Sequence, residues 1–121
     1  VLLWDYSHTL PAGINNQQYF IKDLPPKEKG QVNVAMRGLK PGAYTMTVSQ
    51  VGYKQNDAFT AYIGMGSPKQ LTRPQVAALK ATATGKPLKK QSVTIGPDGV
   101  FATALPLREN DVYLLQLDAA R

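Results

Sequence analysis

The sequence predicts a mainly β fold, an antiparallel β-sandwich of about six to eight strands with one or two short helices inserted in the middle. Short runs alternate between apolar and polar residues, as half-buried strands do. Glycine and proline separate these runs, whereas apolar residues between positions 57 and 82 recur at helical spacing. With 121 residues and 43% hydrophobic content, the chain is expected to form a single domain, residues 1–121, with a core of its own.

The central strands show the clearest alternation. Gln31–Arg37 places Val32, Val34 and Met36 on one face, and Ala43–Val51 repeats the pattern after a Gly- and Pro-containing connection. This arrangement predicts a β-hairpin. Pro97-Asp98-Gly99 predicts a second hairpin, between strands near 92–95 and 100–105.

The two terminal strands are rich in apolar residues. Val1–Tyr6 is strand-like from its first residue, which predicts that the chain is part of a longer protein. Asp111–Leu117 is apolar on both faces, as in a strand packed on two sides or against a neighbouring domain. The residues expected at a domain or oligomer interface are Leu2, Trp4, Tyr6, Val112 and Leu114.

Two short helices are predicted between the strands, near 57–65 and 73–82. In the first, Phe59, Tyr62 and Met65 recur every third residue. The second begins with a capping box, in which Thr72 is the N-cap and Gln75 stands three residues on. A further short strand is expected at Tyr19–Ile21.

The side-chain chemistry argues against a catalytic or metal-binding chain. The sequence has no cysteine and one histidine, His8, so no metal site or cofactor is expected. Its two glutamates, Glu28 and Glu109, stand in polar segments that no pattern brings together across a sugar-sized cleft. The chain alone is therefore not expected to be an enzyme.

The net charge of +6 raises the question of an anionic partner. The basic residues are scattered, apart from Lys86, Lys89 and Lys90, and no aromatic residue interleaves with that cluster. We expect neither nucleic acid nor a membrane as a partner, since no apolar run approaches the roughly 20 residues of a membrane span. The absence of cysteine fits the bacterial cytoplasm but is also compatible with a periplasmic or secreted protein.

Three segments stand out along the chain: Val1–Tyr6; Gly38–Tyr44 running on through Val51-Gly52-Tyr53 to Asn56-Asp57; and Met65–Pro68 with Leu71–Arg73 and Gln75-Val76, joined at a distance by Leu107–Val112. They resemble the C-terminal β-sandwich region of glycoside hydrolase family 39, the β-xylosidase family. The first is similar to the strand by which these enzymes leave the catalytic barrel. Together the segments span nearly the whole chain.

The resemblance implies a parent enzyme whose (β/α)₈ barrel hydrolyses β-xylosides with two glutamates. The Asn-Glu pair typical of the acid/base glutamate is absent from this chain. The resemblance therefore implies a non-catalytic accessory domain that stabilises the barrel, its partner in the same parent chain, and shapes the barrel's rim or an oligomer.

A free-standing carbohydrate-binding module is the alternative. Such modules present exposed aromatic rings to sugars, and the candidates are Trp4, Tyr6, Tyr53 and Tyr62, with Tyr53 and Tyr62 as the expected carbohydrate contacts. Trp4 and Tyr6 share an apolar strand face, where packing is the commoner role.

Overall fold

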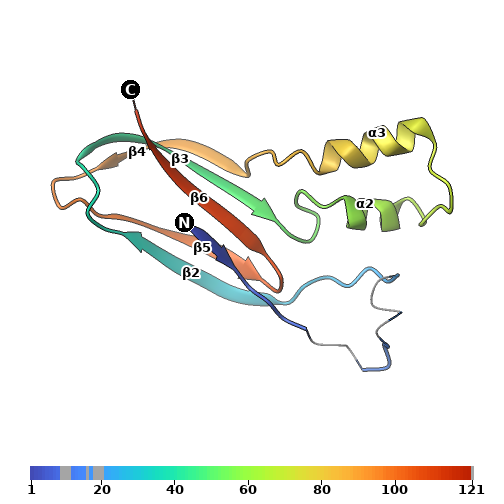
Figure 1. Cartoon of the computed structure of the whole chain (residues 1–121). Helices are drawn as coiled ribbons and strands as arrows, with labels where there is room; N and C mark the ends of the chain where they lie inside the picture. The colour runs from blue at the N-terminus through green and yellow to red at the C-terminus, as the bar shows by residue number, and fades with distance from the viewer. Residues whose placement is uncertain (9–11, 16, 18–20, 121) are drawn as a thin grey trace.

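A computed structural model describes residues 1–8, 12–15, 17 and 21–120 of the chain. Within these residues, six strands form two antiparallel sheets stacked as a sandwich, with two helices at one end (Figure 1). The predicted fold class is confirmed. Tyr19 and Phe20, in the expected short strand at 19–21, lie outside the described residues.

The larger sheet has four strands and the smaller has two. In the larger sheet the order is β1 (Leu2–Trp4), β6 (Val112–Ala119), β3 (Gly42–Val51) and β4 (Lys89–Ile95). The smaller sheet pairs β2 (Glu28–Met36) with β5 (Phe101–Arg108). β4 forms one edge of the larger sheet and carries Lys89 and Lys90, a charge pattern that discourages pairing with another chain.

The core lies between the sheets, on the faces that the alternation predicted. Tyr113 and Leu115 of β6 are at most 1% exposed, and the Tyr113 hydroxyl donates to the carbonyl oxygen of Pro106 at 2.7 Å. That bond satisfies the one polar atom of a buried ring. The buried apolar cluster consists of Met46, Val48, Leu105, Tyr113 and Leu115.

Both predicted hairpins are wrong. The connection at 38–42 leads from β2 in the smaller sheet to β3 in the larger sheet, and the connection at 97–99 leads from β4 back to β5. Alternation specifies which face of a strand is buried but not which strand pairs with it. The two connections contact each other, since the N–H of Leu39 donates to the carbonyl oxygen of Gly99 at 3.0 Å.

The helices α2 (Ala58–Gly64) and α3 (Arg73–Thr82) connect β3 to β4, and they project beyond one end of the sheets (Figure 1). The capping box of α3 is confirmed: the Thr72 side chain accepts from the N–H of Gln75, and the Gln75 side chain accepts from the N–H of Thr72. Asp57 caps α2 in a similar way through the N–H of Thr60 at 3.0 Å. No residue of either helix is buried, so local capping matters here more than packing.

Candidate functional site

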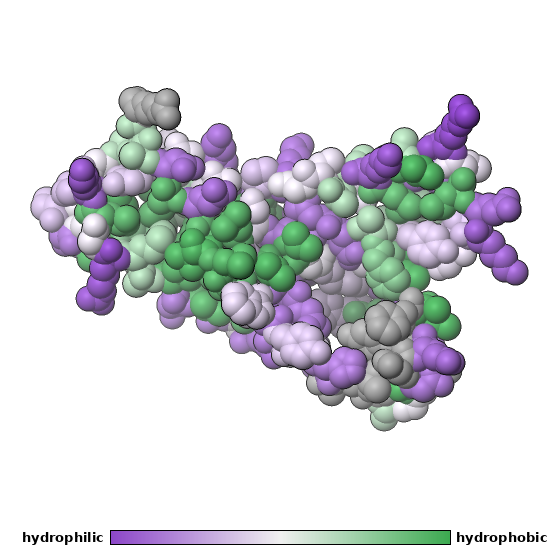
Figure 2. Space-filling model, in the orientation of Figure 1, coloured by the Kyte–Doolittle hydropathy of each residue, from purple (hydrophilic) through white to green (hydrophobic). Residues whose placement is uncertain are grey.

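An apolar surface covers one end of the outer face of the larger sheet. In the register of the strands, Leu2 lies opposite Leu114 and Trp4 opposite Val112. Residues directly opposite each other in an antiparallel pair project to the same side. Trp4 is 64% exposed and Val112 37%, although both are large apolar residues. Figure 2 shows apolar surface gathered over β1 and β6 on this face.

We call this surface the terminal-strand face: Leu2, Trp4, Tyr6, Val51, Val112 and Leu114. Val51 of β3 pairs with Val112 on the side of β6 away from β1, and it is 53% exposed. Tyr6 follows β1 and is 80% exposed. The sequence predicts Leu2, Trp4, Tyr6, Val112 and Leu114 as interface residues, and all five are exposed in the described structure. Val51 was missed, although its place in the alternation of β3 could have indicated it.

The rest of this outer face is polar. Along β3 and β6 the outward positions away from β1 are occupied by Thr45, Thr47, Gln116 and Asp118. The apolar residues are therefore confined to the end of the sheet where β1 pairs with β6. A contiguous apolar patch with a polar border is the usual mark of an interface.

Hydrogen bonds hold the short β1 strand in place. The backbone nitrogen of Val1 donates to the carbonyl oxygen of Leu115 at 2.7 Å, and Asp5 N–H donates to the carbonyl oxygen of Asp111 at 3.0 Å. The Asp5 carboxylate pairs with the Lys29 ammonium at 2.8 Å and accepts from Asn110 N–H at 3.1 Å. The hydrogen bond from Lys29, followed by that from Asn110, lowers the pKa of Asp5.

A buried ion pair holds the β5–β6 turn. Asp111 is 0% exposed and accepts two hydrogen bonds from the Arg108 guanidinium, at 2.9 and 3.0 Å, and one from Arg108 N–H at 3.0 Å. These bonds satisfy a carboxylate that would otherwise be costly to bury. The hydrogen bond to Asp111 raises the pKa of Arg108.

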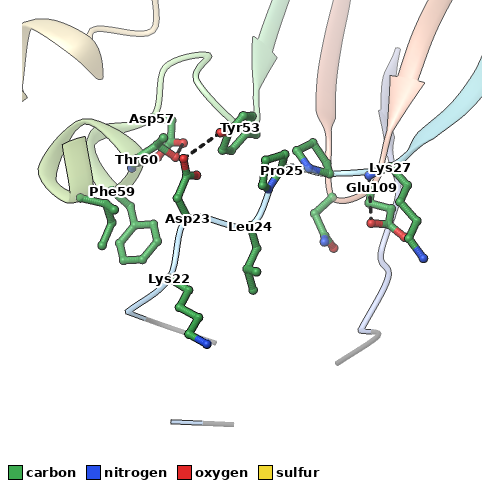
Figure 3. Close-up of a pocket in the computed structure, with 13 residues that line it drawn as sticks. Lys22, Asp23, Leu24, Pro25, Lys27, Tyr53, Asp57, Phe59, Thr60 and Glu109 are labelled. Atoms are coloured by element: carbon green, nitrogen blue, oxygen red, sulfur yellow. Dashed lines mark hydrogen bonds between the residues drawn. The ribbon is translucent and has the colours of Figure 1, made fainter. Parts of the chain in front are cut away.

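A groove of about 540 Å³ lies between the segment 22–27, the helix α2 and the β5–β6 turn (Figure 3). The Tyr53 hydroxyl donates to Asp23 Oδ2 at 3.1 Å, and Lys27 N–H donates to Glu109 Oε2 at 3.1 Å. We call it the Tyr53 groove. Its lining residues are Lys22, Asp23, Leu24, Pro25, Pro26, Lys27, Tyr53, Asp57, Phe59, Thr60, Ile63, Glu109 and Asn110.

The two tyrosines expected to contact carbohydrate are not brought together. Tyr53 lines the groove, whereas the Tyr62 hydroxyl donates to the carbonyl oxygen of Pro68 at 3.1 Å, within the link between the helices. Phe59 and Ile63, which share the groove with Tyr53, were missed as site residues. Their spacing of four residues on a predicted helix was the available signal.

Glu28 and Glu109 lie closer together in the folded chain than the sequence indicated. Glu28 lies opposite Arg108 in the register of β2 and β5, and Glu109 N–H donates to the carbonyl oxygen of Lys27 at 3.0 Å. Their side chains nevertheless line different hollows, since Glu109 lines the Tyr53 groove and Glu28 a second one beside Tyr113.

Two further searches cover only the described part of the chain. Among those residues, no group of three or more His, Cys, Asp or Glu side chains is arranged to hold a metal ion. None of the described helices is long and apolar enough to cross a membrane.

The fold and its exposed face define an antiparallel β-sandwich domain with a helical insertion. Solved structures give the family. The chain aligns with the GH39 enzyme from Xanthomonas axonopodis pv. citri over 98% of its length, with a TM-score of 0.90 and 32% identity. It aligns with a monomeric β-xylosidase from Caulobacter crescentus CB15 over 99% of its length, with a TM-score of 0.88 and 31% identity. The chain is thus similar, over nearly all its residues, to a domain of glycoside hydrolase family 39, consistent with the C-terminal domain that the sequence indicated.

The chain spans only 23% and 24% of the length of these two enzymes. A bacterial orthologue of human α-L-iduronidase shares the fold over 82% of the chain, with a TM-score of 0.65 and 12% identity. No protein-family model and no curated protein sequence matches the chain. The matches therefore show that the chain is similar to a domain that occurs in glycoside hydrolases.

Proposed function

We propose that this chain is a non-catalytic accessory domain of a β-xylosidase-like glycoside hydrolase, and that its terminal-strand face packs against the catalytic part of the parent enzyme. The exposed terminal-strand face carries this proposal. Burying apolar surface contributes about 25 cal/mol per Å², so covering two aromatic and four aliphatic side chains would stabilise an assembly substantially.

The share of the relatives that the chain covers supports the same proposal. A domain that corresponds to 23% of a glycoside hydrolase leaves room for a catalytic part several times its size. We propose that this part is a (β/α)₈ barrel that hydrolyses β-xylosides and that residues 1–121 form one unit beside it. A homo-oligomer is the other arrangement that would cover the face.

A free-standing carbohydrate-binding module is less well supported as the main function. Such modules commonly present several aromatic rings on one surface. Tyr53 and Tyr62 belong to different surroundings. Trp4 and Tyr6 are both exposed, but they stand with aliphatic residues in the terminal-strand face, which we assign to packing. The terminal-strand face would also remain uncovered in a free-standing module.

The test is to produce the catalytic part of the parent enzyme and this chain separately and to mix them. The chain alone should not hydrolyse an aryl β-xyloside, and adding it should raise the thermal inactivation temperature of the catalytic part, because a partner that binds only the folded state stabilises it. Trp4→Ser should abolish this effect. Gln116→Ser, on the polar half of the same sheet face, should preserve it. A catalytic part whose stability is unaffected by the chain would contradict the proposal.

A further inference from the structure

We propose that the Tyr53 groove binds a neutral oligosaccharide, with the Tyr53 ring as a stacking surface and the carboxylates of Asp23 and Glu109 as acceptors for sugar hydroxyls. This binding site goes beyond the proposed accessory role, which uses the terminal-strand face. The volume of about 540 Å³ lies within the range of small-molecule sites.

The turn that carries Tyr53 is held by several hydrogen bonds. Gly52 and Gln55 exchange two backbone bonds, at 3.0 and 2.9 Å. The Asn56 side chain donates to the carbonyl oxygen of Gln50 at 2.8 Å, and Lys54 N–H donates to Asp57 Oδ2 at 3.1 Å. The ring is therefore placed before any ligand arrives, which lowers the entropy cost of binding.

The Tyr53 side chain borders two hollows, the Tyr53 groove and the second hollow beside Tyr113. The Lys54 ammonium lies 5.0 Å from the ring centroid. Lys54 lines the second hollow together with Tyr53 and is not among the described residues that line the groove. The groove side of the ring is left to pack against the C–H face of a sugar, as aromatic rings with a polar end do.

Two carboxylates line the groove at its two ends, Asp23 beside Tyr53 and Glu109 beside Lys27 (Figure 3). Asp23 accepts from the Tyr53 hydroxyl through Oδ2, and Glu109 accepts from Lys27 N–H through Oε2. Neither Asp23 Oδ1 nor Glu109 Oε1 takes part in these two bonds. Ionised carboxylates only accept hydrogen bonds, so these oxygens suit hydroxyl donors. Asp57 differs, since both of its oxygens already accept from Thr60 and Lys54.

The groove's charge is nearly balanced, and most of its remaining surface is apolar. The carboxylates of Asp23, Asp57 and Glu109 are offset by two lysines, Lys22 and Lys27. This balance disfavours an anionic ligand. Leu24, Pro25, Phe59 and Ile63 add an apolar lining that suits the C–H groups of a sugar ring. A cationic peptide could also use aromatic rings and carboxylates, and it is the competing ligand in the test.

The experiment is an amide NMR titration of the chain with xylotriose, with maltotriose and, separately, with a tri-arginine peptide. We expect xylotriose or maltotriose to shift the amides of Asp23, Tyr53 and Glu109 saturably, with millimolar affinity. Tyr53→Ala should weaken this binding at least about tenfold. Asp23→Asn keeps the ring and should weaken it about threefold to tenfold. The matched control is Tyr44→Ala, which removes a tyrosine at the opposite end of β3.

Three results would overturn the proposal: no saturable shift with either sugar, shifts in the groove with the tri-arginine peptide alone, or sugar binding that survives both Tyr53→Ala and Asp23→Asn. If Tyr53→Ala unfolds the chain, the proposal is still tested by the affinity of Asp23→Asn for the sugar and by whether the shifted amides lie in the groove. A negative result would leave the accessory role intact, because the stabilisation of a catalytic part is measured on another surface.

Discussion

Gly52 lies in direct contact with the buried carboxylate of Asp111, so that a Cβ atom at position 52 would stand 2.1 Å from Asp111 Oδ1. No side chain other than hydrogen fits there unless Asp111 moves. Asp111 cannot move without losing its bonds to Arg108, which hold the β5–β6 turn beside the Tyr53 groove. The glycine that breaks the alternation of β3 is therefore required by an ion pair about sixty residues away in the sequence.

Gly52→Ala should lower the free energy of unfolding by roughly 2–4 kcal/mol, because it displaces a buried, paired carboxylate. Urea unfolding followed by circular dichroism measures this loss. Gly64→Ala is the control, since a Cβ there meets nothing within 4 Å and alanine favours the helix by up to about 1 kcal/mol. In an Asp111→Ala background the Gly52→Ala loss should largely disappear. A loss of the same size in that background would contradict the contact.

Thr72→Ala should destabilise the start of α3 by about 0.5–2 kcal/mol, because it removes the side-chain acceptor for Gln75 N–H. Since α3 has no buried residue, we expect the effect as faster amide hydrogen exchange within residues 75–80 rather than as global unfolding. Thr72→Ser keeps the hydroxyl and should restore protection. Unchanged exchange in Thr72→Ala would show that the helix does not depend on this cap.

Stability should fall in acid below about pH 4, through Asp5 and Asp57. Hydrogen bonds from Lys29 and then Asn110 lower the pKa of Asp5. Burial opposes the charge of Asp57, but hydrogen bonds from Thr60 and Lys54 outweigh it and lower its pKa. A carboxylate whose pKa is lower in the folded state contributes stability above its ordinary pKa of 3.8 and loses it as the pH falls through the folded value.

Asp57→Asn isolates part of this effect, because asparagine also caps a helix but carries no charge. The variant should have a lower free energy of unfolding than the unmutated chain at pH 7, and the difference should be smaller at pH 3. Asp118→Asn, on an exposed strand position, is the control. If the free energy of unfolding depends on pH in the same way in Asp57→Asn and in the unmutated chain, the contribution assigned to the Asp57 carboxylate is contradicted.

The isolated chain should self-associate through its terminal-strand face, since an uncovered apolar patch and an unpaired strand edge both recruit a partner. Sedimentation velocity should show a mass that rises with protein concentration. Trp4→Ser should shift the equilibrium towards the monomer more than Gln116→Ser does. A monomer of unchanged mass at the highest accessible concentration would contradict this prediction.

Local patterns predicted the faces and the helices but not the pairing. The alternation around Met46 and Tyr113 identified buried positions, and the Thr72–Gln75 spacing located the start of α3. The same alternation is compatible with a hairpin or with a crossing between sheets, so the connections at 38–42 and 97–99 were misassigned.

The two candidate surfaces also differ in how far the sequence predicted them. The terminal-strand face could be predicted because its residues share two short strands with strong alternation. The Tyr53 groove could not be predicted from the sequence. Asp23 and Glu109 line it from segments that are more than eighty residues apart, and only the folding of the chain brings these segments together. The role of Asp111 was hidden for the same reason: a strand-end aspartate gives no sign in the sequence that it will be buried against Gly52.

The most direct test of the central claim is the solvent exposure of Trp4, the only tryptophan of the chain. We would label the chain with 5-fluorotryptophan, so that an unlabelled catalytic part of the parent enzyme contributes no ¹⁹F signal. In the dilute chain alone, the single ¹⁹F resonance should show the solvent-isotope shift of a ring that is 64% exposed. After the catalytic part is added, the account predicts a new resonance that has lost this shift. A resonance that stays at its original position and keeps its solvent-isotope shift, in a complex shown to have formed, would contradict the claim that the terminal-strand face is the interface.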